Sequence, residues 1–178
     1  MKEVWLYTYG GSGKAGWESN FSSRYGDISN SDRDPFDLPL CQNSYTVYDY
    51  NYGRDVPEAV HNHMHQFESI FGEVDSSLFW GKFTRSCGNT HFPPNGQADY
   101  DYHNPNPVLT DCEDWHPVGT GQLTSISNAT WGDNETNYYI FWMQNIPGAG
   151  NGLTDCSPQD LACVPTKQLK NKLSQAAA

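Results

Sequence analysis

Apolar residues recur at helical spacing between residues 56 and 71. The stripe consists of Val56, Val60, Met64, Phe67 and Phe71, widened on one side by Ala59 and Ile70. This spacing places the side chains on one helix face, which we expect to pack against the core. Asp55 can cap the first turn with Glu58 at capping-box spacing, and Pro57 suits the opening helical positions. The pattern predicts one amphipathic helix that ends at Gly72.

Shorter runs of alternating or aromatic residues predict strands. They cover residues 3–9, 45–50, 126–131 and 137–145. The last run is long and aromatic, so we expect it near the centre of the sheet. A second, short helix is predicted over residues 75–83, with Asp75 or Ser76 as its cap. Together these elements predict an α+β fold, in which a small, mostly antiparallel sheet packs against one main amphipathic helix.

Between residues 87 and 117 the apolar residues follow no regular spacing, and several prolines interrupt the chain. This segment carries aromatic residues and two cysteines that should not stay solvated, so we expect a long ordered central loop rather than disorder. Residues 166–178 read as a short, peripheral helical tail. No internal repeat is visible, and the length of 178 residues suits a single domain over residues 1–178.

The chain is strongly acidic, with 21 Asp and Glu residues against 10 Lys and Arg and a net charge of −11. This charge argues against nucleic acid as a partner, because its binding needs a cationic surface. The same charge disfavours anionic membranes, and no apolar run is long enough to span a bilayer. Tyrosine and tryptophan beside acidic groups suit a small-molecule, sugar or peptide ligand better than a phosphorylated one.

Cysteines and glycosylation sequons favour an extracellular location. The sequons begin at Asn20, Asn128 and Asn134. Cys87 could pair with Cys112 and Cys156 with Cys163, which leaves Cys41 as the odd cysteine. The first residues form a strand pattern that is too short for a signal peptide, so secretion would require a leader that was removed. A reduced cytosolic protein is the alternative.

Three alternating histidines on the predicted helix are expected to have different roles. His61, His65 and Glu68 lie together beside the apolar stripe, at spacings of four and three. Two imidazoles and a carboxylate on one face suit a single divalent metal ion, and zinc fits these ligands. The alternative is a solvated flank that keeps the helix soluble. His63 falls inside the apolar arc, which predicts a core histidine with one ring nitrogen bonded to a neighbour.

The central loop holds a second concentration of ligand-type residues. The candidates are His91, Asp101, His103 and His116. One or more of them could fold over the helix and complete the coordination of His61 and His65. The acidic residues of the same loop suit calcium instead, although they do not match the twelve-residue calcium-binding loop. The alternative for this loop is simple solvation.

These features predict a secreted metal-binding protein and, as an extension, a metal-dependent hydrolase. A bound zinc ion would make water acidic, and Glu68 is the candidate catalytic residue that accepts its proton. The helix lacks the His-Glu-x-x-His order of familiar zinc peptidases. The alternative is an extracellular carbohydrate-binding module with a structural calcium ion and no catalysis. A purely structural or interaction protein is a third option, because no motif is complete.

Overall fold

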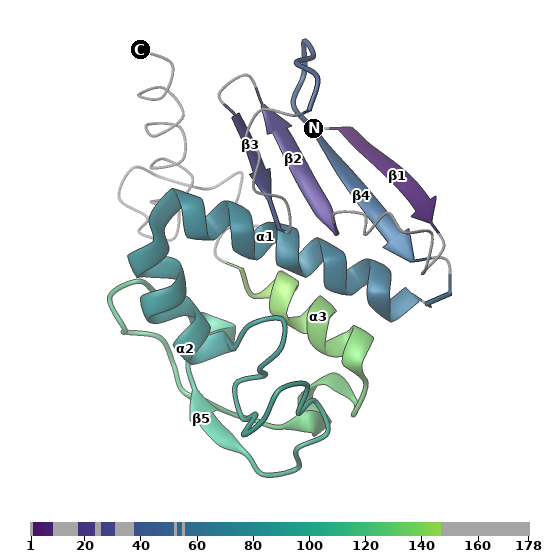
Figure 1. Cartoon of the computed structure of the whole chain (residues 1–178). Helices are drawn as coiled ribbons and strands as arrows, with labels where there is room; N and C mark the ends of the chain where they lie inside the picture. Colours follow the sequence, from purple (N-terminus) through teal and green to yellow (C-terminus); the bar gives the residue numbers. More distant parts are fainter. Residues whose placement is uncertain are drawn as a thin grey trace. The chain divides into compact units, whose positions relative to one another are not determined.

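The computed structural model describes residues 2–8, 18–23, 26–30, 38–51, 53–54 and 56–146. These residues form the predicted α+β fold, with a four-stranded sheet, a two-stranded sheet and one long helix (Figure 1). They divide into two compact units, the first extending to Glu73 and the second beginning at Val74. The predictions for Asp55, for the pair Cys156 and Cys163 and for the tail over residues 166–178 lie outside the described residues.

The four-stranded sheet belongs to the first unit. Its strands are β1 (Lys2–Thr8), β2 (Ser19–Ser23), β3 (Gly26–Ser29) and β4 (Tyr45–Asn51), in the order β1-β4-β2-β3. β1 runs parallel to β4, whereas β2 is antiparallel to both β4 and β3, so the sheet is mixed but mostly antiparallel. The sequence predicted β1 and β4. It missed β2 and β3, because their serine, asparagine and glycine residues carry no clear apolar alternation.

One face of this sheet packs against helix α1 (Val56–Leu78) (Figure 1). The buried positions Thr46, Tyr48 and Tyr50 alternate along β4, which is the pattern of a strand with one covered face. On the helix, Met64 is fully buried, as its place in the apolar stripe predicted. Val56, from the same stripe, is 67% exposed. The side chains of α1 that bond to the sheet, Asn62 and Gln66, also lie outside the predicted apolar stripe.

Two buried amide side chains complete the contact between α1 and the sheet. Asn62 donates a hydrogen bond from Nδ2 to the carbonyl oxygen of Asp49 at 3.0 Å, and Gln66 donates from Nε2 to that of Ile28 at 3.0 Å. Both side chains are 1% exposed. Because a buried N–H group must find an acceptor, these bonds set the position of the helix on the sheet more narrowly than apolar contact alone.

Helix α1 does not end at Gly72, so this predicted boundary is wrong. The helical backbone continues to Asp75, whose φ of −155° and ψ of 88° are non-helical. A glycine within a helix costs only about 1 kcal/mol, which packing can offset. Asp75 Oδ1 accepts a hydrogen bond from the backbone N–H of Leu78 at 3.0 Å, as the predicted cap requires. The chain then passes through a π-helical segment, η1 (Phe79–Phe83), into α2 (Thr84–Cys87).

Aromatic side chains form the core of the second unit around helix α3 (Glu135–Gln144). Tyr138, Tyr139 and Trp142 are each 0% exposed. The indole N–H of Trp142 donates to the carbonyl oxygen of Gly88 at 3.0 Å, so a buried polar atom of the core is satisfied by the loop that surrounds it.

The strand predicted over residues 137–145 is wrong, because nearly all of this segment lies in α3. Asn134 caps the helix, since its Oδ1 accepts a hydrogen bond from the backbone N–H of Asn137 at 3.0 Å. Aromatic residues favour strands mainly because they pack well on a half-buried surface. A helix that buries them satisfies the same requirement, and here tertiary packing overrides the local preference.

The strand predicted over residues 126–131 is also largely wrong. Strand β6 covers Thr124–Ile126 and pairs with β5 (Val108–Thr110) in an antiparallel two-stranded sheet. The following residues form the 3-10 helix η3 (Asn128–Trp131). Ser127 accepts from the backbone N–H of Ala129, and Thr130 completes a capping box with it. This capping explains why the chain turns where an extended strand was expected.

The central segment between Cys87 and Pro117 is a long loop, as predicted, in which only β5 and the 3-10 turn η2 (Cys112–Asp114) are regular. A disulfide between Cys87 and Cys112 confirms the expected cross-link. Within the loop, Asn95 donates from Nδ2 to the carbonyl oxygen of Asn104 at 2.8 Å. Side-chain hydrogen bonds and a covalent bond thus take the place of regular backbone pairing.

Candidate metal-binding site

Helix α1 carries His61 and His65 one turn apart on the same face of the first unit. Their ring centroids are 4.5 Å apart and the rings are inclined at 77°. One ring nitrogen of His61 lies within 4.8 Å of one ring nitrogen of His65. Zinc–nitrogen bonds of ~2.0–2.1 Å in a tetrahedral site separate two ligand nitrogens by about 3.3 Å. A small side-chain rotation would therefore bring both nitrogens to one metal ion.

Glu68 contacts the second of these histidines directly. Its Oε2 lies 2.9 Å from Nδ1 of His65. With an ionised carboxylate, which can only accept, Nδ1 would carry the hydrogen and the ring lone pair of a neutral His65 would be on Nε2. A carboxylate on the opposite ring nitrogen is the arrangement that orients metal-binding histidines. The side chains of His65 and Glu68 are 16% and 7% exposed, which a solvated flank does not explain.

His63 has a different environment: one ring nitrogen is bonded to neighbours, as predicted, but the side chain is 23% exposed and so only partly buried. Its Nδ1 lies 2.8 Å from the carbonyl oxygen of Ala59 and 3.2 Å from the hydroxyl of Tyr50. Its ring stacks on Tyr48 with a centroid distance of 4.0 Å. Burial raises the pKa of both tyrosines, so their hydroxyls stay protonated. His63 therefore holds α1 against β4.

The histidines predicted as loop ligands lie in the second unit, and each has a neighbour there. His91 Nδ1 is 3.3 Å from Asp99, His103 Nδ1 is 2.8 Å from Asp133, and His116 Nε2 is 3.3 Å from Asp114. Nε2 of His91 also lies 3.1 Å from the hydroxyl of Tyr100. Among the described residues of this unit, no three His, Cys, Asp or Glu side chains lie close enough to share one ion. Their role as ligands stays a prediction.

Carboxylates of the loop bind groups of the loop itself. Asp101 Oδ2 accepts hydrogen bonds from the backbone N–H of Gln97 and from Nδ2 of Asn104, both at 2.9 Å. The backbone N–H of Gln122 donates to Asp114 at 2.8 Å and holds the pKa of that carboxyl below its usual range. These contacts give the acidic residues a part in shaping the loop.

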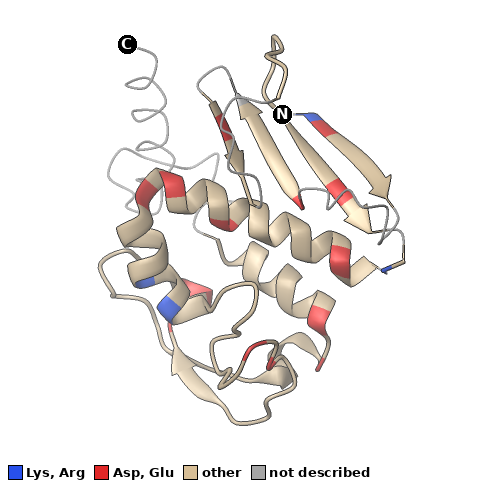
Figure 2. Cartoon of the chain, viewed as in Figure 1, with Lys and Arg blue, Asp and Glu red and all other residues tan. Residues whose placement is uncertain are grey.

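Acidic residues occur in both units, whereas lysine and arginine residues are few (Figure 2). This distribution accompanies the net charge of −11. Among the described helices, none combines the length and the hydrophobicity that a membrane span needs.

Sequence reasoning placed His61, His65 and Glu68 on one helix face but missed the aromatic partners of His63. The signal for those partners was the tyrosine alternation of β4, which leads directly into α1. It also missed the surface of α3, because that segment was interpreted as a strand. Asn134 followed by Glu135 is a typical helix start and could have indicated the helix.

Comparison with known proteins found no similar protein. No family model, no curated protein and no solved structure matches the chain.

Proposed function

We propose that the protein binds a divalent transition metal ion, zinc in the first place, through His61 and His65. The observation that carries this proposal is the pair of imidazoles one helical turn apart, with Glu68 bonded to Nδ1 of His65. The hydrogen bond favours metal binding through Nε2 because it selects the required tautomer. In this proposal Glu68 is a positioning residue for His65, in place of the role first predicted for it as the acceptor of the proton from water.

The donor chemistry distinguishes between metals. Imidazole nitrogens suit zinc, copper, nickel and iron, whereas calcium takes oxygen ligands. A helix that offers two histidines therefore favours a transition metal over calcium. Calcium on the oxygen donors of the central loop belongs to the alternative proposal, a carbohydrate-binding module without catalysis.

Hydrolysis is the reaction that such a site would support. Catalytic zinc sites commonly have three protein ligands and one exchangeable position, and the metal there acidifies water or polarises a carbonyl group. We propose a metal-dependent hydrolase as the extension of metal binding. Which loop residue supplies a further ligand is tested by the metal content of alanine variants of His91, Asp101, His103 and His116.

We propose an extracellular location for the protein. The disulfide between Cys87 and Cys112 supports it, because such bonds persist mainly in oxidising compartments. Of the three sequons, the one at Asn134 begins on an exposed residue, whereas Asn20 is 0% exposed in β2. Glycosylation of the folded protein is therefore proposed at Asn134 and not at Asn20.

Elemental analysis of the natively purified protein, after dialysis against metal-free buffer, tests the site. We expect about one equivalent of zinc or another transition metal per chain. His61→Ala and His65→Ala should each remove the metal while circular dichroism shows an unchanged fold. His63→Ala is the matched control on the same helix. It should keep the metal and lower the free energy of unfolding by about 1–3 kcal/mol, because the ring loses its contacts with Tyr48 and Tyr50.

The variant Glu68→Gln tests whether metal affinity depends on the hydrogen bond between the Glu68 carboxylate and His65. Glutamine has the same shape but is a weaker acceptor, so metal affinity should fall about 10–100-fold with little change in stability. Full metal occupancy in both His61→Ala and His65→Ala would disprove the site. Calcium instead of a transition metal would move the proposal to the carbohydrate-binding module.

A further inference from the structure

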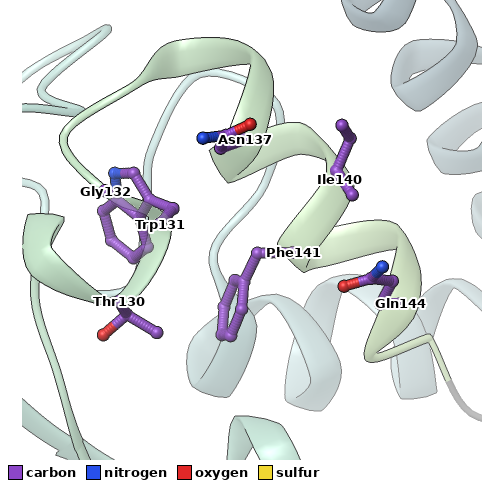
Figure 3. Close-up of a pocket in the computed structure, with 7 residues that line it drawn as sticks. All are labelled: Thr130, Trp131, Gly132, Asn137, Ile140, Phe141 and Gln144. Carbon is purple, nitrogen blue, oxygen red and sulfur yellow. The ribbon is translucent and has the colours of Figure 1, made fainter.

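A cavity of about 290 Å³ opens on the second unit, between η3 and helix α3 (Figure 3). Thr130 and Trp131 come from η3, whereas Asn137, Ile140, Phe141 and Gln144 project from α3. The cavity lies entirely within this unit and contains none of the proposed metal ligands.

The walls of this cavity are held by contacts that exist without a ligand. Trp131 is 3% exposed, and its indole N–H donates to the carbonyl oxygen of Tyr102 at 2.8 Å. Its ring lies 5.8 Å from that of Phe141 and 5.1 Å from that of Tyr138. Asn134 caps the first turn of α3, the helix that forms the other wall of the cavity. A ligand would therefore meet a largely pre-formed surface, which lowers the entropic cost of binding.

The cavity is lined by apolar side chains and by uncharged polar side chains. Phe141 and Ile140 offer ring and aliphatic surface, and Ile140 is 40% exposed. Asn137, Gln144 and Thr130 offer two amides and a hydroxyl, which can both donate and accept hydrogen bonds. No residue that lines the cavity carries a charge.

We propose that this cavity binds a single neutral sugar ring. A sugar presents C–H faces that pack on aromatic surface and hydroxyls that pair with amides, which matches both kinds of group in the cavity. The absence of a charged lining residue disfavours anionic and cationic ligands, because neither finds a counter-charge. The volume is near the lower limit of the ~300–1,000 Å³ range of small-molecule sites, so one ring fits better than a chain.

Titration of the full chain with three sugars of the same ring size, followed by amide chemical shifts in NMR spectra, tests this proposal. The probes are neutral N-acetylglucosamine, cationic glucosamine and anionic glucuronate. We expect saturable shifts at residues 137–144 with N-acetylglucosamine, at a dissociation constant on the order of 1 mM. Glucosamine and glucuronate should bind at least about tenfold more weakly, as their charges lose hydration without compensation.

Variants of the lining residues connect the shifts to the cavity. Phe141→Ala should weaken binding about tenfold through lost stacking. Gln144→Ala, which changes an exposed side chain and leaves the core intact, should weaken it about threefold to tenfold. Gln122→Ala is the matched control, because Gln122 is exposed, lies outside the cavity and bonds to Asp114 only through its backbone in the described contacts.

The proposal is independent of the metal site, so the titration is repeated with a chelator. Unchanged binding in its presence supports a metal-free cavity. The proposal would be overturned by the absence of saturable shifts with N-acetylglucosamine, by stronger binding of a charged sugar, or by equal binding to wild type and Gln144→Ala. Loss of binding with the chelator would also contradict it, since no metal takes part.

Discussion

The disulfide between Cys87 and Cys112 should contribute a large share of the stability of the second unit. The two cysteines are 25 positions apart in the chain. In the chain-entropy treatment, closing a loop of this length stabilises the folded state by about 3.5 kcal/mol at 25 °C. We therefore expect the double variant Cys87→Ala with Cys112→Ala to lose about that amount. A loss of this size is large, because whole proteins are stable by only about 5–15 kcal/mol.

Urea denaturation followed by tryptophan fluorescence measures this loss. The assay reports mainly on the second unit, because Trp80, Trp115, Trp131 and Trp142 belong to it. With a urea dependence of about 1–3 kcal/mol per M, the midpoint should fall by at least about 1 M. Chemical reduction of the wild type should lower the midpoint by at least the same amount, because it would also break the bond predicted between Cys156 and Cys163. Cys41→Ala is the control, since Cys41 is an exposed thiol outside the bond.

A small shift would refute this reasoning. The hydrogen bond from Thr110 Oγ1 to the carbonyl oxygen of Ser86, at 2.6 Å, joins the same two segments without covalent help. If the double variant changed the midpoint by less than about 0.3 M, equivalent to under about 1 kcal/mol, such contacts alone would hold the loop. The chain-entropy estimate would then not apply to this unit.

Two further predictions concern the same unit. Asn134→Ala should destabilise α3 by about 1 kcal/mol, because it removes the cap on the Asn137 amide; Asn134→Asp, which keeps an acceptor oxygen, should restore the stability in urea titrations, and equal midpoints for both variants would contradict the assignment. The pKa of Asp114 is lower in the folded than in the unfolded chain, chiefly through the Gln122 amide, so its contribution is complete above the ordinary aspartate range and is lost as pH falls through the lowered value. Urea midpoints measured against pH should therefore show less acid dependence in Asp114→Asn, and parallel curves for wild type and variant would exclude this contribution.

The spacing of apolar residues was sufficient to predict the elements that have one buried and one exposed face. The 3.6-residue spacing of α1 and the alternation of β4 report directly which side of each element is covered. The same spacing placed His61, His65 and Glu68 together, because residues three and four apart share a helix face. The hydrogen bond between Glu68 and His65 could not be predicted from this spacing alone, because it depends on side-chain rotamers.

The amino-acid sequence by itself determined the α+β class, the main helix, two of its strands and the cross-link of the central loop. Only the tertiary structure decided that Ser19–Ser23 is a strand, because its pairing with β4 comes from backbone hydrogen bonds that any side chain allows. It also decided that the aromatic segment after Asn134 is a helix, because burial of Tyr138, Tyr139 and Trp142 outweighs their local preference for strands. The cavity on α3 follows from that choice, so the sequence pattern could not reveal it.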